Sequence, residues 1–331
     1  MRDQIRRFTK VTFASLFLLG SLGWMAQPTS AGTLSTAVIG MFPKEVGEFT
    51  YADLKTARKF PWFNQLKEQM LPSHFRDFEK FLGSAGVDPN TQVDELAWAA
   101  ITATKTSGEQ VVGVALGAFD PSSSEDHFKQ QKLPMVEVHG YHLWAFGSGT
   151  GATDILFMFI DANTAAFGNR GALEELIDVR TGVAESLLSN DFIFSLIGEA
   201  NGTGTIWSVL DKNYAHLAMQ QLLPEATQFP QAAPILGRIR AMIITVSADS
   251  GIDAHFQAVC STPDDANLLA AGLQAALMMR RYQEAQDHPD LAGALDQVRV
   301  SPTGDRLKID APVSQDQLLS LIKTRAFASP M

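Results

Sequence analysis

The chain has 331 residues, of which 46% are hydrophobic, and a formal net charge of −10. This length and composition argue against an intrinsically disordered protein and predict one large domain or two modest ones. The acidic balance disfavours nucleic acids and anionic lipid headgroups as partners, since both are bound largely through Lys and Arg.

The first 31 residues have the pattern of a signal peptide. Four basic residues within the first ten precede an apolar run over residues 11–26, which is shorter than the roughly 20 residues that a membrane span needs. Small residues predict cleavage after Ala31, which would remove four bases and one acid and leave a net charge of −13. An uncleaved anchor is the alternative, and Arg6-Arg7 leaves the twin-arginine route open beside general export. We expect an exported soluble protein, periplasmic or extracellular, with no stable membrane span after cleavage.

The rest of the chain predicts an α+β fold built from two tandem modules, residues 32–182 and 183–331. Each module has the order β-α-β-β-α-β-β-α, and alternating strands such as DRLKIDA (305–311) favour antiparallel sheets backed by helices. Strand-like runs recur in both halves: FTYADL (49–54), LAWAAITAT (96–104) and VVGVALGAF (111–119), then TIWSVLD (205–211), AMIITVSA (241–248) and IDAHFQAVC (252–260).

Two similar helix starts follow these strands at an offset of 142 residues. Asp120 and Thr262 are good N-cap residues, and Pro121 and Pro263 suit the first helical position. Acidic residues in the first turns complement the positive end of the helix dipole, so these starts require no ligand. The shared offset predicts an internal duplication, and the second helix is expected to run from Pro263 to about Tyr282.

Cys260 is the only cysteine, so no intramolecular disulfide is possible. Alternation along IDAHFQAVC places Cys260 on the same strand face as Phe256 and Ala258. The pattern therefore predicts a buried, unreactive thiol. A catalytic thiol, the alternative, requires an activating base and solvent exposure.

A longer stretch, FIDANTAAFGNRGALEELID (159–178), combines a strand ending in Asp, a polar turn, a strand ending in Gly and an immediate helix. Together with FPKEVGEFTYADL (42–54) and LGSAGVDPNTQVDELAWAA (82–100), it resembles exported bacterial proteins of unknown function built from a duplicated α+β module. The resemblance implies the fold and export. That group has no established activity to carry over.

The sequence contains no recognisable motif for catalysis or for cofactor binding, and we predict no catalytic residue and no cofactor. Gly-x-Ser-x-Gly is absent, and the glycine-rich loop GSGTGATD (147–154) lacks the Gly-Lys-Ser/Thr ending of a phosphate loop. The closest histidine pair, His139 and His142, flanks Gly140. If Gly140 marks a tight turn, the two imidazoles and Glu137 are candidate metal ligands, although histidines at half-exposed strand positions are common.

Two groups of apolar residues are candidates for recognition. Trp62 and Phe63 in KFPWFNQL belong to the types that anchor interfaces, and Leu277, Met278 and Met279 end the long helix with side chains that adapt to varied apolar ligands. Core packing is the alternative for both groups. The proline-containing segment 222–239 is predicted to be a cover over a sheet edge or a movable lid.

These observations favour a non-enzymatic binding or interaction protein whose partner is an unknown protein or an apolar small molecule. One alternative is a periplasmic carrier of an apolar ligand or lipid, with a pocket of several hundred Å³ lined by the long helix and covered by 222–239. A hydrolase with an unrecognised site is the second alternative.

Overall fold

The structure, a computed structural model, describes residues 32–60, 63–64, 67, 73–84, 87–102, 109–149, 151, 154–222, 236–248, 251–287, 289–314 and 317. The predicted signal peptide lies outside these residues. The chain divides into two compact units, an N-terminal unit of Thr33–Lys59 and Pro72–Ser195 and a C-terminal unit of Phe60–Leu71 and Leu196–Met331. The module boundary predicted between residues 182 and 183 stays a prediction. In the described ranges, no helix combines the length and the hydropathy that a bilayer crossing requires.

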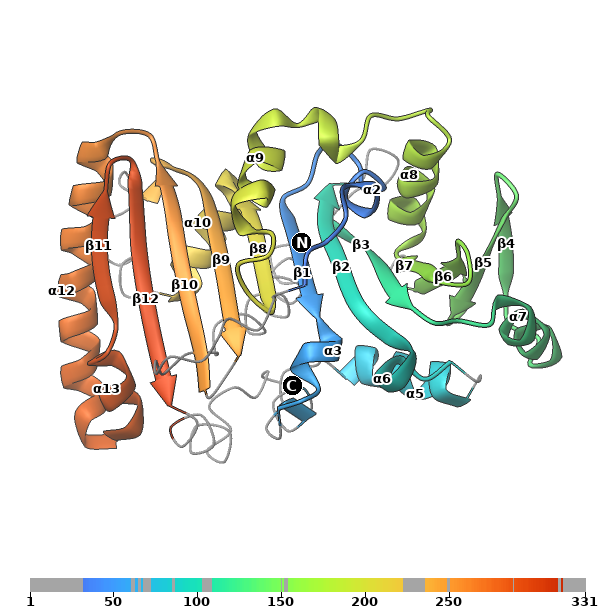
Figure 1. Cartoon of the computed structure of the whole chain (residues 1–331), viewed down its shortest axis with the longest axis horizontal. Helices are drawn as coiled ribbons and strands as arrows, with labels where there is room; N and C mark the ends of the chain where they lie inside the picture. Colours follow the sequence, from blue (N-terminus) through green and yellow to red (C-terminus); the bar gives the residue numbers. More distant parts are fainter. Residues whose placement is uncertain are drawn as a thin grey trace. The chain divides into compact units, whose positions relative to one another are not determined.

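The N-terminal unit contains an antiparallel sheet with the strand order β1-β2-β3-β7-β6-β5-β4 (Figure 1). The strands are β1 (Glu48–Asp53), β2 (Val93–Thr102), β3 (Glu109–Gly117), β4 (Met135–Val138), β5 (Tyr141–Phe146), β6 (Ile155–Phe159) and β7 (Thr164–Gly168). The helices are α2 (Thr36–Ile39), α3 (Leu54–Ala57), α5 (Ser73–Ser84), α6 (Pro89–Gln92), α7 (Pro121–Gln130), α8 (Arg170–Arg180) and the 3₁₀ helix η1 (Leu187–Ser189).

Gly168 ends β7 because the strand there lies very close to β3. A Cβ atom at this position would lie 2.2 Å from the carbonyl oxygen of Val111, and φ is +154°. Asn169 follows, and its side-chain oxygen accepts a hydrogen bond from the backbone N–H of Val111 at 3.0 Å. The helix α8 then begins at once and packs on β3, β6 and β7. The Gly-then-helix pattern seen in the sequence is therefore a packing device.

Aromatic side chains fill the core beneath α5 and α7. Phe128 of α7 is fully buried and meets Phe157 of β6 edge to face, with ring centroids 5.1 Å apart. Its ring also lies 5.5 Å from that of Trp144 in β5. Phe81 of α5 packs against the same cluster. Edge-to-face contacts of this kind add to the stabilisation from apolar burial.

The C-terminal unit contains an antiparallel sheet with the strand order β8-β9-β10-β12-β11. Its strands are β8 (Ile206–Asp211), β9 (Ile239–Ala248), β10 (Gly251–Cys260), β11 (Arg299–Thr303) and β12 (Arg306–Ser314). Its helices are α10 (Lys212–Leu222), α12 (Pro263–Asp287) and α13 (Pro289–Leu295), and the division between the units falls within α9 (Asp191–Ala200).

The helices α10 and α12 pack against one face of this second sheet and bury its apolar side chains. Leu307 and Ile309 of β12 are buried while Lys308 is exposed, as the alternation predicts. Leu269 and Leu273 of α12 pack into the same apolar cluster. Figure 1 shows α12 alongside β11 and β12, and its contacts reach β10 as well.

The predicted α+β class, with antiparallel sheets and packed helices, is confirmed. The helix starts at Pro121 and Pro263 are also confirmed, although α12 extends beyond Tyr282 to Asp287. The N-terminal unit departs from the predicted order, because the hairpin β4–β5 follows α7 and adds two strands at the edge of the sheet. Of the last helix predicted in the second module, residues 318–322 lie outside the described residues.

Candidate functional site

The helix α12 forms one wall of the candidate site, and its start is fixed by a capping arrangement. The hydroxyl oxygen of Thr262 accepts a hydrogen bond from the backbone N–H of Asp265 at 3.2 Å and donates to its carboxylate at 2.7 Å. The guanidinium of Arg238 also pairs with this carboxylate. The Thr262 hydrogen bond, followed by the Arg238 contacts, lowers the pKa of Asp265, whose side chain is buried.

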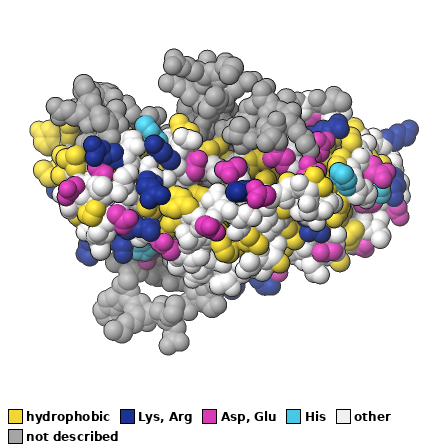
Figure 2. All heavy atoms as spheres, turned by 90° about the horizontal axis from the view of Figure 1, so that it is seen from above, with side chains coloured by type: hydrophobic (Ala, Val, Ile, Leu, Met, Phe, Trp, Pro, Cys, Tyr) yellow, Lys and Arg dark blue, Asp and Glu magenta, His cyan; other side chains and the backbone are white. Residues whose placement is uncertain are grey.

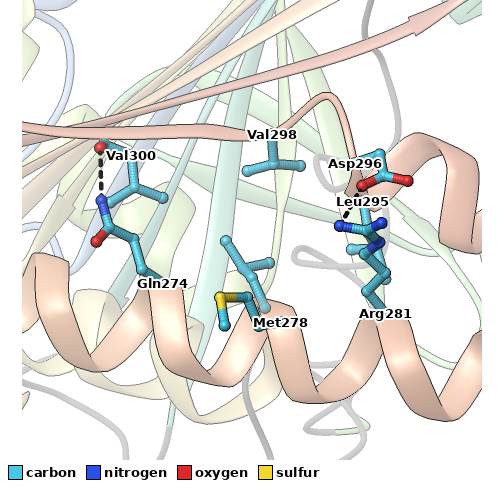
Figure 3. A pocket seen from close by; sticks show the side chains of 8 residues that line it. Gln274, Met278, Arg281, Leu295, Asp296, Val298 and Val300 are labelled. Carbon is cyan, nitrogen blue, oxygen red and sulfur yellow. Dashed lines mark hydrogen bonds and ion pairs between the residues drawn. The ribbon is translucent and has the colours of Figure 1, made fainter.

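The opposite wall comes from the end of α13 and from β11, which follow α12 in the chain. Two polar contacts hold this wall to α12 (Figure 3). The side-chain amide of Gln274 donates to the carbonyl oxygen of Val300 at 3.2 Å. The guanidinium of Arg281 lies 2.6 Å from the carboxylate of Asp296. The two contacts fix the spacing between the helix and the strand.

Between these walls lies a groove with two cavities, which we call the α12 groove. The first cavity has a volume of about 280 Å³ and the second about 600 Å³. The two cavities share Met278, Arg281 and Asp296. The first is otherwise lined by Gln274, Leu277, Leu295, Val298 and Val300, and the second by Tyr282, Ala285, Pro289, Ala292 and Gly293.

The lining of the groove combines apolar side chains with a few polar ones. Apolar side chains outnumber polar ones in its lining, and its charged side chains form one ion pair that neutralises both charges. Met278 is 69% exposed and Tyr282 is 84% exposed, so large apolar surface faces solvent at the groove. A flexible thioether side chain adapts to ligands of different shape. The groove therefore offers apolar contacts beside one ion pair.

The three residues predicted at the end of the long helix have different places in the structure. Leu277 is half-buried against the core and lines the first cavity, and Met278 lines both cavities. Met279 is 42% exposed and lines neither cavity. Sequence reasoning missed the opposing wall, because Leu295, Val298 and Val300 belong to no motif and meet α12 only after the chain turns back.

The aromatic candidates do not contribute to this groove. Phe63 is half-buried and packs against the apolar core of the C-terminal unit, which is the packing alternative considered for it. Trp62 lies outside the described residues. The proposed cover, residues 222–239, also lies mostly outside them.

The histidine pair lies on the β4–β5 hairpin, where His139 and Gly140 form the turn with φ values of 50° and 84°. The tight turn is present, yet the two imidazoles contact different carboxylates. A ring nitrogen of His142 lies 2.9 Å from Glu125 of α7, whereas His139 lies 3.8 Å from Asp178 of α8. Glu137 pairs with His142 across the hairpin ladder. Among the described residues, no group of three His, Cys, Asp or Glu side chains has a metal-binding arrangement.

Cys260 is 1% exposed, which confirms the predicted burial. Burial, together with the charges of Asp265 and Asp305, raises the pKa of its thiol to about 11. A thiol in this state is protonated at neutral pH and is a poor nucleophile. The geometry therefore assigns Cys260 to the core.

A second polar pair, which the sequence reading did not identify, lies between β1 and β2. The hydroxyl of Tyr51 donates to the carboxylate of Glu95 at 3.1 Å, and Tyr51 is fully buried. Burial raises the pKa of the Glu95 carboxyl above its ordinary value, and it also raises the pKa of the Tyr51 phenol. Asp53, directly opposite Glu95 in the ladder, adds to both shifts and caps α3 through the Thr56 N–H. No signal in the sequence marks this pair, since it arises from strand register.

On the face shown in Figure 2, acidic and basic side chains are interspersed among the described residues. Among the described residues, pairs at the surface include Lys55 with Asp94 and the half-buried Arg306 with Glu199. Isolated surface pairs contribute little to stability. This view therefore indicates an ordinary mixed surface on that side.

Comparisons with known proteins give no family. No protein-family model matches the chain, and no curated protein matches it. Solved structures of TP0453 have a low level of similarity to this chain. Crystal form I has a TM-score of 0.48 and 12% sequence identity, covering 92% of this chain and 100% of that chain. Crystal form IV has a TM-score of 0.47 and 11% sequence identity, covering 86% of this chain and 95% of that chain. Neither likeness carries an argument about function.

Proposed function

We propose that the protein is a non-enzymatic binding protein that holds an elongated apolar ligand in the α12 groove. The observation that carries this proposal is that two solvent-open cavities, of about 280 and 600 Å³, share Met278 and have more apolar than polar side chains in their lining. Small-molecule sites are concave and mostly apolar, with a few polar groups that fix orientation. This proposal takes up the carrier alternative from the sequence.

An acyl chain or a similar flexible hydrocarbon fits the groove chemistry best. Each buried methylene contributes roughly 0.8 kcal/mol, so a chain along Leu277, Met278 and Val298 gains affinity without any charged contact. The Arg281–Asp296 pair is polar and close to neutral, so it suits a polar end group near the protein surface. Whether residues 222–239 cover the bound ligand stays a prediction.

Export is part of the proposal. The support for it is the sequence of residues 1–31, with its basic start, apolar run and small residues before the predicted cleavage position. A periplasmic or extracellular binding protein needs no catalytic machinery. Action through surface contacts with another protein becomes the leading hypothesis if the groove binds nothing, and the hydrolase alternative stays a prediction.

We also propose that the two units derive from duplication of one α+β module. The support is the strand order, since β1-β2-β3-β7-β6 and β8-β9-β10-β12-β11 follow the chain in the same way. Both modules also place a proline at the first position of the helix after the third strand. An experimental structure in which these five-strand sets fail to superpose would contradict the duplication.

The test of the binding proposal is a fluorescence titration with N-phenyl-1-naphthylamine, a neutral apolar probe. We expect enhanced emission on binding, and at least tenfold weaker binding by the variant Met278→Glu, because the carboxylate places charge in both cavities. Ala275→Glu is the matched control, since Ala275 is exposed on α12 but lines neither cavity. Failure of the parent chain to bind the probe, or equal weakening by both variants, would overturn the proposal.

A further inference from the structure

The last described residue, Gln317, begins a helix directly after β12. Its side-chain oxygen accepts a hydrogen bond from the backbone N–H of Ser314 at 2.8 Å, and its own backbone N–H donates to the hydroxyl of Ser314 at 3.2 Å. Two reciprocal bonds of this kind form a capping box, which marks the first turn of a helix. Gln317 is itself helical, so the chain leaves the sheet as a helix.

This helix start lies against α13, at the edge of the α12 groove. A Cβ atom at Gly293 of α13 would lie 3.9 Å from the side-chain nitrogen of Gln317. Gly293 is one of the residues that line the second cavity. Residues 318–331, which lie outside the described residues, therefore follow a residue that is already next to the lining of this cavity.

The sequence after the capping box predicts an amphipathic helix. Leu318, Ile322 and Ala326 recur at intervals of four residues, which places them on one face of a helix. Ser320 and Thr324 fall on the opposite face. A helix with one apolar face is stabilised when that face packs against another apolar surface. The segment therefore requires an apolar surface close to its start.

The α12 groove offers such a surface at a matching length. Met278 and Tyr282 are 69% and 84% exposed at the groove. Residues 274–285 of α12 reach from the first cavity to the second and span about 16 Å at 1.5 Å per residue. Residues 318–329 form a helix of the same length. An amphipathic helix that lies in an apolar groove is a recurring mode of recognition.

We propose that residues 318–329 dock as a helix in the α12 groove, running from the second cavity toward the first, and compete there with the apolar ligand. This inference rests on the proposed function, because competition requires the groove to be the ligand site. The segment is attached beside the groove, so its effective concentration is roughly millimolar and weak docking is enough. Docking lowers the apparent affinity for ligand in proportion to the fraction of molecules whose groove is open.

Disulfide trapping in a Cys260→Ala background tests the docking without any ligand. Met278→Cys is combined in turn with Ile322→Cys and Ala326→Cys in the full chain. We expect mild oxidation to give an intramolecular disulfide in at least one of the two pairs, detected as a monomer that no longer reacts with maleimide. Gln283→Cys replaces Met278→Cys in the control pairs, since Gln283 is exposed on α12 but lines neither cavity. Free thiols in both Met278→Cys pairs, or equal trapping in the control pairs, would overturn the docking.

Titration of full-length variants with N-phenyl-1-naphthylamine tests the competition. Ile322→Glu places a charge on the apolar face of the segment, so we expect it to bind the probe about threefold more tightly than the parent chain. Ser320→Glu adds the same charge to the opposite face and is expected to bind the probe as the parent chain does. Unchanged or weaker binding by Ile322→Glu would overturn the competition. If no chain binds the probe, the ligand site and the competition both fail, and the trapping result decides the docking by itself.

Discussion

The guanidinium of Arg281 lies 2.6 Å from the carboxylate of Asp296, and this ion pair joins α12 to the chain directly after α13. Both residues line both cavities of the α12 groove. The pair is half-exposed on each side, so screening by water limits its contribution to stability. Its main effect is therefore local, because it sets the position of the wall that carries Leu295 and Val298.

Replacing Asp296 with alanine is expected to affect the groove more than the fold. We predict a loss of less than about 1 kcal/mol in the free energy of unfolding by urea. Binding of the neutral probe is expected to weaken by up to about fivefold, since the untethered wall must be ordered on binding. Glu174→Ala, which removes an exposed pair with Arg170 in the N-terminal unit, is the control. Equal probe affinity in the two variants would show that the pair does not organise the groove.

The thiol of Cys260 is expected to react slowly in the native state. Burial raises its pKa to about 11 and also blocks access of the reagent. Labelling with a maleimide at pH 7 should be slow in buffer and fast in denaturant. The exposed variant Gln283→Cys in a Cys260→Ala background gives the rate for an accessible thiol. Native labelling of Cys260 at that rate would mean that the face of β10 has been assigned wrongly.

Asp265→Asn is predicted to destabilise the C-terminal unit at neutral pH. The folded-state pKa of Asp265 is lowered, so its contribution is present above the unfolded value of 3.8 and is lost as pH falls through the folded value. The difference in unfolding free energy between parent and variant should therefore shrink in acid. Asp264→Asn is the matched control, since Asp264 is exposed beside it. A difference that does not vary with pH would rule out the carboxylate charge as the cause.

Glu95→Gln is predicted to stabilise the fold at neutral pH, in contrast to Asp265→Asn. Burial raises the folded-state pKa of Glu95, so its ionisation opposes folding once the pH exceeds the ordinary carboxyl value of 4.5. The amide keeps an acceptor for the Tyr51 hydroxyl and removes the charge. The variant should unfold at higher urea concentration than the parent at pH 7, with a smaller gain at pH 4. Lower stability at pH 7 would show that the charged hydrogen bond outweighs the burial cost.

The sequence predicts local structure well where a short-range rule applies. Pro121 and Pro263 mark helix starts because capping and dihedral preference act within one turn, and Cys260 is buried because strand alternation has a period of two. The sequence does not predict β4 and β5 as strands of their own, because β4 is partly exposed and its hydrophobic alternation is weak. Val298 and Met278 line the same cavity because the chain turns back after α12 through α13. Glu95 contacts Tyr51 because of the register between two strands. Such long-range pairings leave no local signal.

Native mass spectrometry of the protein purified from its own cell envelope tests the binding proposal most directly. The proposal predicts a noncovalent adduct of the mass of a fatty acid or lipid. It also predicts that Met278→Glu abolishes the adduct while Ala275→Glu retains it, with both variants unfolding at the same urea concentration as the parent chain. A bare protein mass for the parent chain, or an adduct that Met278→Glu leaves unchanged, would contradict the assignment of the α12 groove as the ligand site.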